Sequence, residues 1–117
     1  MSGAVSYHAG ACAEQAVARH YVEAGRSIAA RRWRGSGGEI DLIARDGDGL
    51  IFIEVKQSRS FDRAAESLTR RQMDRIYASA SEFLAAEPTG QDTESRFDVA
   101  LVDGVGRIRI IENAFQQ

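Results

Sequence analysis

Two apolar segments separated by a short turn place the strongest constraint on the fold of this chain. Residues 39–45 read E-I-D-L-I-A-R, residues 50–57 read L-I-F-I-E-V-K-Q, and the sequence D-G-D-G lies between them at 46–49. β-branched and aromatic residues favour strands, and Asp-Gly pairs are typical of hairpin turns. The sequence therefore predicts an antiparallel hairpin whose strands belong to the core.

Further elements are predicted on both sides of this hairpin. They are an alanine-rich helix over 2–24, a weaker strand over 27–33 followed by a loop at 35–38, a polar loop over 58–63, a second helix over 65–86, and strands over 96–103 and 107–112. The order helix, three strands, helix, two strands predicts an α/β fold in which two main helices flank one central mixed β-sheet. Because no repeat or linker divides the chain, residues 1–117 are expected to form a single domain.

Composition narrows the class of protein. Hydrophobic residues make up 44% and charged residues 27% of the chain, which is typical of a globular domain and not of a disordered one. The single cysteine, Cys12, excludes an internal disulfide and a cysteine-rich zinc site, and we expect it to be a small buried residue in a reducing compartment. The longest apolar run is L-I-F-I at 50–53 and no secretory signal is evident, so a cytoplasmic location without a membrane partner is predicted.

Acidic residues interrupt the predicted core strands. Alternation places Glu39 and Asp41 on one face of the first hairpin strand, and Glu54 and Lys56 on one face of the second. Because a hairpin makes the two strands neighbours, we expect Asp41 and Glu54 to lie close together. Two carboxylates among apolar residues require compensation by a proton, by the Lys56 ammonium, or by a divalent metal, for which oxygen ligands suit Mg²⁺ or Mn²⁺. Glu39 is placed either to support such a site or to cap the glycine-rich loop before it.

Lysine is the exception among the basic residues of this chain. The chain has 15 Lys and Arg residues, of which Lys56 is the only lysine. A lysine ammonium is compact and its pKa shifts readily on burial, whereas an arginine is planar and permanently charged. The formal net charge of −2 does not favour general nucleic-acid binding, although arginines gather locally over 19–34 and 59–75.

The central motifs resemble those of the PD-(D/E)xK nuclease superfamily. The two motifs are G-E-I-D-L-I-A at 38–44 and F-I-E-V-K at 52–56. More narrowly, the chain resembles the small bacterial UPF0102 (YraN-like) family, which is related to archaeal Holliday-junction resolvases. The features shared with that family are Ala13-Glu14, Trp33-Arg34, Arg96-Phe97-Asp98-Val99 and Asn113-Ala114-Phe115. The resemblance spans residues 10–115 and implies a restriction-endonuclease-like core.

This resemblance also implies a site and a reaction. Asp41, Glu54 and the Val55 carbonyl would bind Mg²⁺ or Mn²⁺, Glu14 would add a carboxylate, and Lys56 would orient the attacking water. The implied reaction is hydrolysis of DNA phosphodiester bonds, with branched, damaged or single-stranded DNA among the candidate substrates. The candidate nucleic-acid contacts are Arg31, Arg32, Arg34, Arg59, Arg71 and Gln72. The chain departs from the family pattern at Ser58, where arginine is frequent, and at Gln72, where lysine is common.

A second class of function stays open at this point. The chain could be a non-catalytic nucleic-acid-binding or partner-binding domain that retained the nuclease fold. The small size and modest basic surface favour this interpretation, or dependence on a homodimer or a partner protein. The joint presence of Asp41, Glu54 and Lys56 favours the enzyme.

Overall fold

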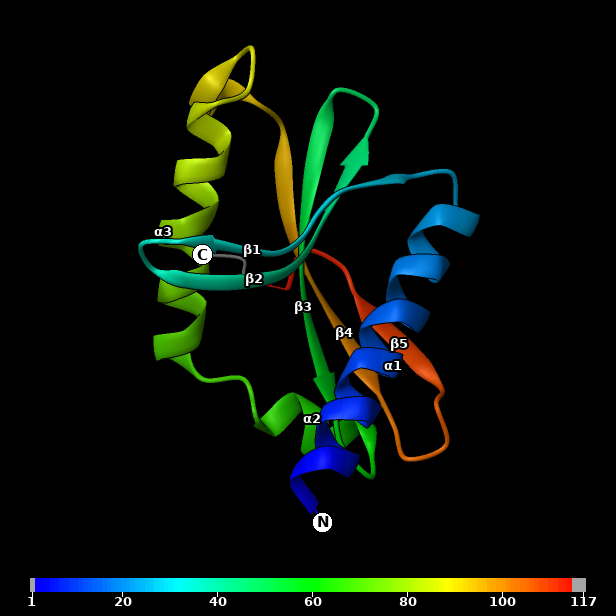
Figure 1. Cartoon of the computed structure of the whole chain (residues 1–117). Coiled ribbons are helices and arrows are strands. Elements are labelled where there is room, and N and C mark those ends of the chain that lie inside the picture. Colours follow the sequence, from blue (N-terminus) through cyan, green and yellow to red (C-terminus); the bar gives the residue numbers. More distant parts are fainter. Residues whose placement is uncertain (1, 115–117) are drawn as a thin grey trace.

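A five-stranded mixed sheet forms the centre of the protein. The computed structural model describes the backbone of residues 2–114 and the side chains of residues 12–114. Its elements are α1 (Ser2–Glu23), β1 (Ser27–Gly35), β2 (Gly38–Asp46), β3 (Gly49–Gln57), α2 (Phe61–Glu66), α3 (Arg70–Ala85), the 3₁₀ helix η1 (Gly90–Asp92), β4 (Ser95–Val102) and β5 (Ile108–Ile111). The strands are ordered β1-β2-β3-β4-β5, and every neighbouring pair is antiparallel except β3 and β4. This arrangement confirms the predicted α/β class and central mixed sheet (Figure 1).

Tight turns join the first three strands. The D-G-D-G sequence forms the predicted hairpin, in which Asp46 pairs with Gly49 and Gly47 has a φ of 61°. The predicted loop at 35–38 is instead a second hairpin, because Gly35 pairs directly with Gly38. A Cβ at Gly37 would lie 2.5 Å from the Arg75 carbonyl oxygen, so this glycine allows the hairpin to pack closely against α3.

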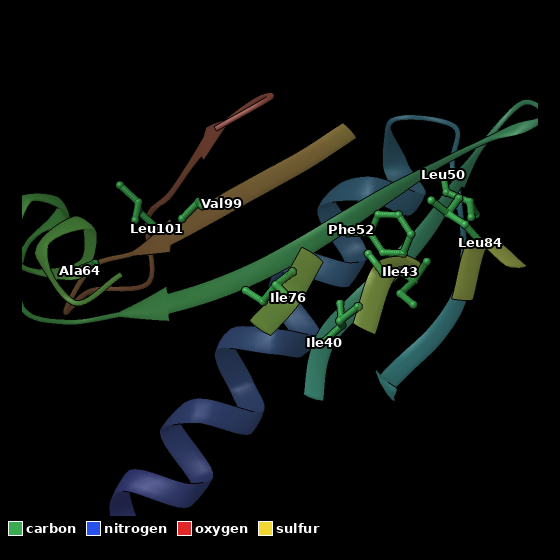
Figure 2. Packing of buried hydrophobic residues seen from close by; sticks show 10 residues of the cluster. Ile40, Ile43, Leu50, Phe52, Ala64, Ile76, Leu84, Val99 and Leu101 are labelled. Atoms are coloured by element: carbon green, nitrogen blue, oxygen red, sulfur yellow. The ribbon is translucent and has the colours of Figure 1, made fainter. Parts of the chain in front are cut away.

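The two faces of the sheet bury separate apolar clusters. Leu50 and Phe52 of β3 pack toward α2 and α3, whereas the alternating Ile51 and Ile53 pack toward α1. Figure 2 shows the first cluster, to which α3 contributes residues such as Ile76. Full burial of one such side chain contributes about 1.5–3 kcal/mol, so β3, buried on both faces, is the centre of the fold.

The predicted second helix is two helices. Phe61–Glu66 form α2, where a loop was expected, and α3 begins only at Arg70. The Ser60 side chain accepts a hydrogen bond from the Arg63 N–H, and the Thr69 side chain accepts one from the Gln72 N–H. Each hydroxyl acts as an N-cap, so the chain starts a helix twice. The expectation of one helix over 65–86 was therefore wrong at its beginning.

A buried hydrogen bond anchors α1 to the sheet. The Tyr21 hydroxyl donates to Asp98 Oδ2 at 2.7 Å, and Arg96 Nε and Nη2 donate to the same carboxylate at 3.0 and 3.1 Å. Asp98 is fully buried, so these donors replace the water that it has lost. The anchor lies seven residues, or two helical turns, beyond Glu14 and so fixes the position of that carboxylate along the sheet.

One expectation for α1 was wrong. Cys12 is exposed, and the adjacent Ala13 takes the buried position; an alanine-rich helix gives little signal for its orientation. No helix within the described residues is long and apolar enough to cross a membrane.

Candidate active site

The candidate site lies where β2 and β3 separate. The two strands pair from Asp46 and Gly49 as far as Leu42 and Ile53. Beyond that point β2 remains paired only with β1, and β3 only with β4. Figure 1 shows the β1–β2 hairpin turning away toward α3. The edge of β3 is therefore open from residue 54 onward.

Asp41 occupies the first position after the strands separate. Its Oδ2 atom accepts a hydrogen bond of 2.8 Å from the Val55 N–H, which has lost its partner strand. The N–H and C=O of one strand residue point toward the same neighbour, so the Val55 carbonyl also faces this open edge. A carboxylate and a backbone carbonyl are thus placed side by side.

Glu54 is a buried carboxylate beside Asp41. It is 6% exposed, and burial raises the pKa of its carboxyl to about 8, with the hydrogen bond and negative charge of Asp41 adding to the effect. Lys56 opposes this increase, because its Nζ lies 3.5 Å from Glu54 Oε2. The structure therefore brings Asp41, Glu54 and Lys56 together, as the hairpin predicted.

Glu14 reaches the same region from α1. Burial and the nearby charge of Asp41 raise the pKa of its carboxyl, while Arg32 opposes the change. Arg32 Nε donates to Glu14 Oε1 at 3.1 Å. Arg32 itself lies opposite Asp41, between the pairs Arg31–Leu42 and Trp33–Ile40, and has a φ of 48°. A positive φ is costly for a residue with a side chain, so β1 carries backbone strain directly beside the site.

Gln72 was predicted to contact nucleic acid, but its side chain lies against Glu54. Its Nε2 atom donates a short hydrogen bond to Glu54 Oε2. The Thr69 cap places residue 72 in the first turn of α3. A Thr three residues before Gln72 was therefore the sequence signal for a helix start that positions this side chain. This contact holds one Glu54 oxygen in place.

Four other nucleic-acid candidates, all arginines, do not contact the site residues. Arg31 and Arg71 are exposed, and Arg34 Nη2 pairs with Glu39 Oε2 at 3.0 Å across the β1–β2 hairpin. Glu39, which was expected either to support the site or to cap the loop before it, therefore forms an ion pair with Arg34. Arg59 lies beyond the end of β3 and lines a separate pocket. Among the described residues, none of these four arginines bonds to Asp41, Glu54 or Lys56.

The donor set fits a hard divalent cation. Asp41, Glu54 and the Val55 carbonyl offer only oxygen atoms, which Mg²⁺ and Mn²⁺ prefer. Burial, together with the hydrogen bond and charge of Asp41, raises the pKa of Glu54, and a cation bound between the two carboxylates would oppose that increase. Among the side chains described for residues 12–114, no group of three or more His, Cys, Asp or Glu residues is already placed to hold a metal ion, and Glu14 is paired with Arg32.

Fold and site together define an α/β domain with a carboxylate–lysine cluster at the open edge of its central strand. The chain belongs to the uncharacterised protein family UPF0102, whose model matches residues 13–102. A UPF0102 protein of Cereibacter sphaeroides is 70% identical over 115 residues and spans 98% of both chains. A UPF0102 protein of Ruegeria pomeroyi is 61% identical over 113 residues, which are 97% of this chain and 92% of the relative. A UPF0102 protein of Roseobacter denitrificans is 48% identical over 116 residues, which are 99% of this chain and 90% of the relative. The resemblance of the chain to the UPF0102 family is thereby confirmed.

Proposed function

We propose that this protein is a metal-dependent endonuclease that hydrolyses DNA phosphodiester bonds at the open edge of β3. The observation that supports the proposal is the convergence of Asp41, Glu54 and Lys56 at the point where β2 leaves β3. The resemblance of both strand motifs to the PD-(D/E)xK nucleases supports the same function.

Each residue has a role that follows from its surroundings. Asp41, Glu54 and the Val55 carbonyl would hold Mg²⁺ or Mn²⁺, and Glu14 is a further carboxylate within reach. When bound, the metal supplies Lewis acidity toward the phosphoryl oxygen and acidifies its water. Gln72 keeps Glu54 oriented through its amide.

Lys56 is the residue that we assign to the attacking water. Its side chain is 18% exposed and its ammonium lies 3.5 Å from Glu54 Oε2, so the charge is largely shielded from solvent beside the carboxylates. From this position it donates to a water or a phosphate oxygen, and it stabilises the negative charge that develops on the phosphate. A compact donor on a flexible stem suits this position better than a planar guanidinium.

Metal titration and a cleavage panel test the proposal. Calorimetry should detect Mg²⁺ or Mn²⁺ binding to the wild type and its loss in Asp41→Ala. Single-stranded, duplex, flapped and four-way-junction DNA, together with RNA, should then be incubated with the wild type, Glu54→Ala and Lys56→Ala. We expect cleavage of at least one DNA by the wild type only. Cleavage that survives both substitutions would refute the site, and absence of metal binding at millimolar concentration would refute the enzyme.

The Arg32–Glu14 pair favours a second candidate, a nucleic-acid-binding domain that retained the fold without catalysis. The guanidinium already neutralises one carboxylate of the site at 3.1 Å, so a cation is present without a metal. DNA binding that is unaffected by divalent metal, with no cleavage of any substrate, would establish this candidate instead.

A further inference from the structure

A second basic region lies beyond the carboxyl ends of the parallel strands β3 and β4. β3 and β4 end side by side, with Gln57 aligned to Val102. The loop after β3 leads into α2, and the turn after β4 leads into β5. Between them is an open pocket of about 310 Å³ whose lining includes Arg59, Arg107 and Arg109. Arg107 and Arg109 lie outside the residues that the family model matches.

The acidic residues of this pocket compensate only part of its positive charge. Asp103 is buried and fully engaged, since it accepts hydrogen bonds from the Val105 and Arg107 N–H groups and from Arg107 Nε at 2.6 Å. The Asp103 charge is therefore balanced by Arg107. Arg59 and Arg109 then face a single exposed carboxylate, that of Asp62. The pocket keeps an excess positive charge in a chain whose net charge is −2.

The framework of the pocket is ordered rather than a loose collection of side chains. The Arg109 guanidinium lies 4.6 Å from the centroid of the Phe61 ring, a cation–π contact that holds its plane in place. The Gly104 N–H donates to the Arg59 carbonyl at 3.4 Å, which ties the two loops together. A planar guanidinium held in this way suits bidentate recognition of a phosphate.

The strand register relates this pocket to the candidate active site. Lys56 aligns with Leu101, and Leu101 aligns with Arg109. Directly paired residues project from the same face of a sheet, so Lys56 and Arg109 lie two strand spacings apart, about 10 Å. α2 covers the middle of this row, because Ala64 and Leu101 belong to one apolar cluster. The two cations thus flank α2, at a separation of about three nucleotides at 3.4 Å rise each.

We propose that this pocket binds a backbone phosphate of the DNA strand, about three nucleotides along the strand from the phosphate that lies at Lys56. The inference rests on the proposed action on DNA and adds a second anchor that sets the path of the strand across α2. Arg59 and Arg109 contact the phosphate, Phe61 positions Arg109, and the Asp103–Arg107 pair maintains the turn. Asp62 weakens binding by its charge.

DNA binding measured against salt tests this proposal. Fluorescence anisotropy in EDTA, where cleavage is blocked, should compare the wild type with Arg59→Gln, Arg109→Gln and Asp62→Asn between about 50 and 200 mM salt. Arg19→Gln, at an exposed site on α1, is the matched control. Thermal unfolding checks that each variant folds.

The expected result is specific to the pocket. Arg59→Gln and Arg109→Gln should each weaken binding at low salt at least about threefold and reduce the slope of log K against log salt by up to about 0.9. Asp62→Asn should tighten binding, and Arg19→Gln should match the wild type. If both pocket variants bind DNA as tightly as the wild type, with unchanged salt slopes, the proposed phosphate site is refuted but the proposed function stands. Failure of the wild type to bind any DNA overturns both. Binding of inorganic phosphate at the pocket without any effect of the variants on DNA also overturns the proposal.

Discussion

The Val55 N–H donates a 2.8 Å hydrogen bond to the Asp41 carboxylate, at the position where the next ladder bond between β2 and β3 would form. One side chain therefore completes the sheet and also presents an oxygen to the site. The candidate active site is built from the polar groups that the separation of the two strands leaves without partners. A substitution at Asp41 consequently affects both the fold and the chemistry, and the two effects can be separated.

Asp41→Asn and Asp41→Ala are expected to differ in stability but not in metal binding. The asparagine oxygen still accepts from Val55, whereas alanine leaves that N–H without its acceptor, which costs about 1–3 kcal/mol. Both remove the negative charge, so both should abolish Mg²⁺ or Mn²⁺ binding. Urea unfolding and calorimetry measure the two effects. Equal stability of the two variants would show that the Val55 bond contributes nothing to the fold.

Lys56→Arg is expected to lose activity while the protein stays folded. The substitution keeps the positive charge next to Glu54, from which Nζ is 3.5 Å away, but replaces a compact donor with a larger planar group. We expect DNA cleavage to fall by about 100-fold or more, with an unchanged melting temperature. Arg70→Lys, at a position where the arginine side chain is 86% exposed, is the reciprocal control and should retain activity. Full activity of Lys56→Arg would show that any cation suffices there.

Stability is expected to decrease as pH rises toward 8. Burial, with Asp41 nearby, raises the pKa of Glu54 from 4.5 to about 8, so the folded state holds a proton that the unfolded chain releases. This contribution is fully present below about pH 4.5 and is lost as pH rises through about 8. A pKa difference of one corresponds to about 1.4 kcal/mol, so the effect of Glu54 is measurable by urea unfolding.

Glu54→Gln is the control for this pH dependence. The amide resembles the protonated carboxyl and does not titrate, so the difference in unfolding free energy between variant and wild type should grow as the pH increases. Saturating Mg²⁺ should reduce that difference, because the metal replaces the proton on Glu54. A constant difference across this range would contradict the assigned pKa.

The hairpin and its carboxylates could be predicted because their signals are local. Alternation, β-branched residues and an Asp-Gly turn set the strands and their register, and that register brings residue 41 next to residue 54. The resemblance located Glu14 near the same site. These inferences needed no knowledge of how the hairpin packs.

The separation of β2 from β3 could not be predicted in this way. The β1–β2 hairpin packs against α3 at Gly37, and this contact joins segments about forty residues apart. Gln72, in the first turn of α3 behind the Thr69 cap, reaches Glu54, which lies 18 residues earlier in the chain. The two helix starts had a local signal in Ser60 and Thr69, but a continuous polar–apolar pattern over 65–86 obscured it.

The strained backbone of Arg32 gives a prediction that compares two small residues. Arg32→Gly and Arg32→Ala both remove the ion pair with Glu14, but only glycine adopts a φ of 48° without steric cost. Arg32→Gly should therefore be more stable than Arg32→Ala by about 1 kcal/mol. The adjacent Arg31, exposed and without a positive φ, is the matched control. There the order should reverse, since glycine weakens a strand interior.

Activity measurements on the same variants relate this strain to function. Strained residues persist mainly where the surrounding structure and the site require them. We therefore expect Arg32→Gly to lose DNA cleavage although it is the more stable of the two variants. If Arg32→Gly cleaves DNA as the wild type does, the Arg32 side chain and its strained backbone are not needed for activity. Equal stabilities of Arg32→Gly and Arg32→Ala would show that residue 32 carries no strain.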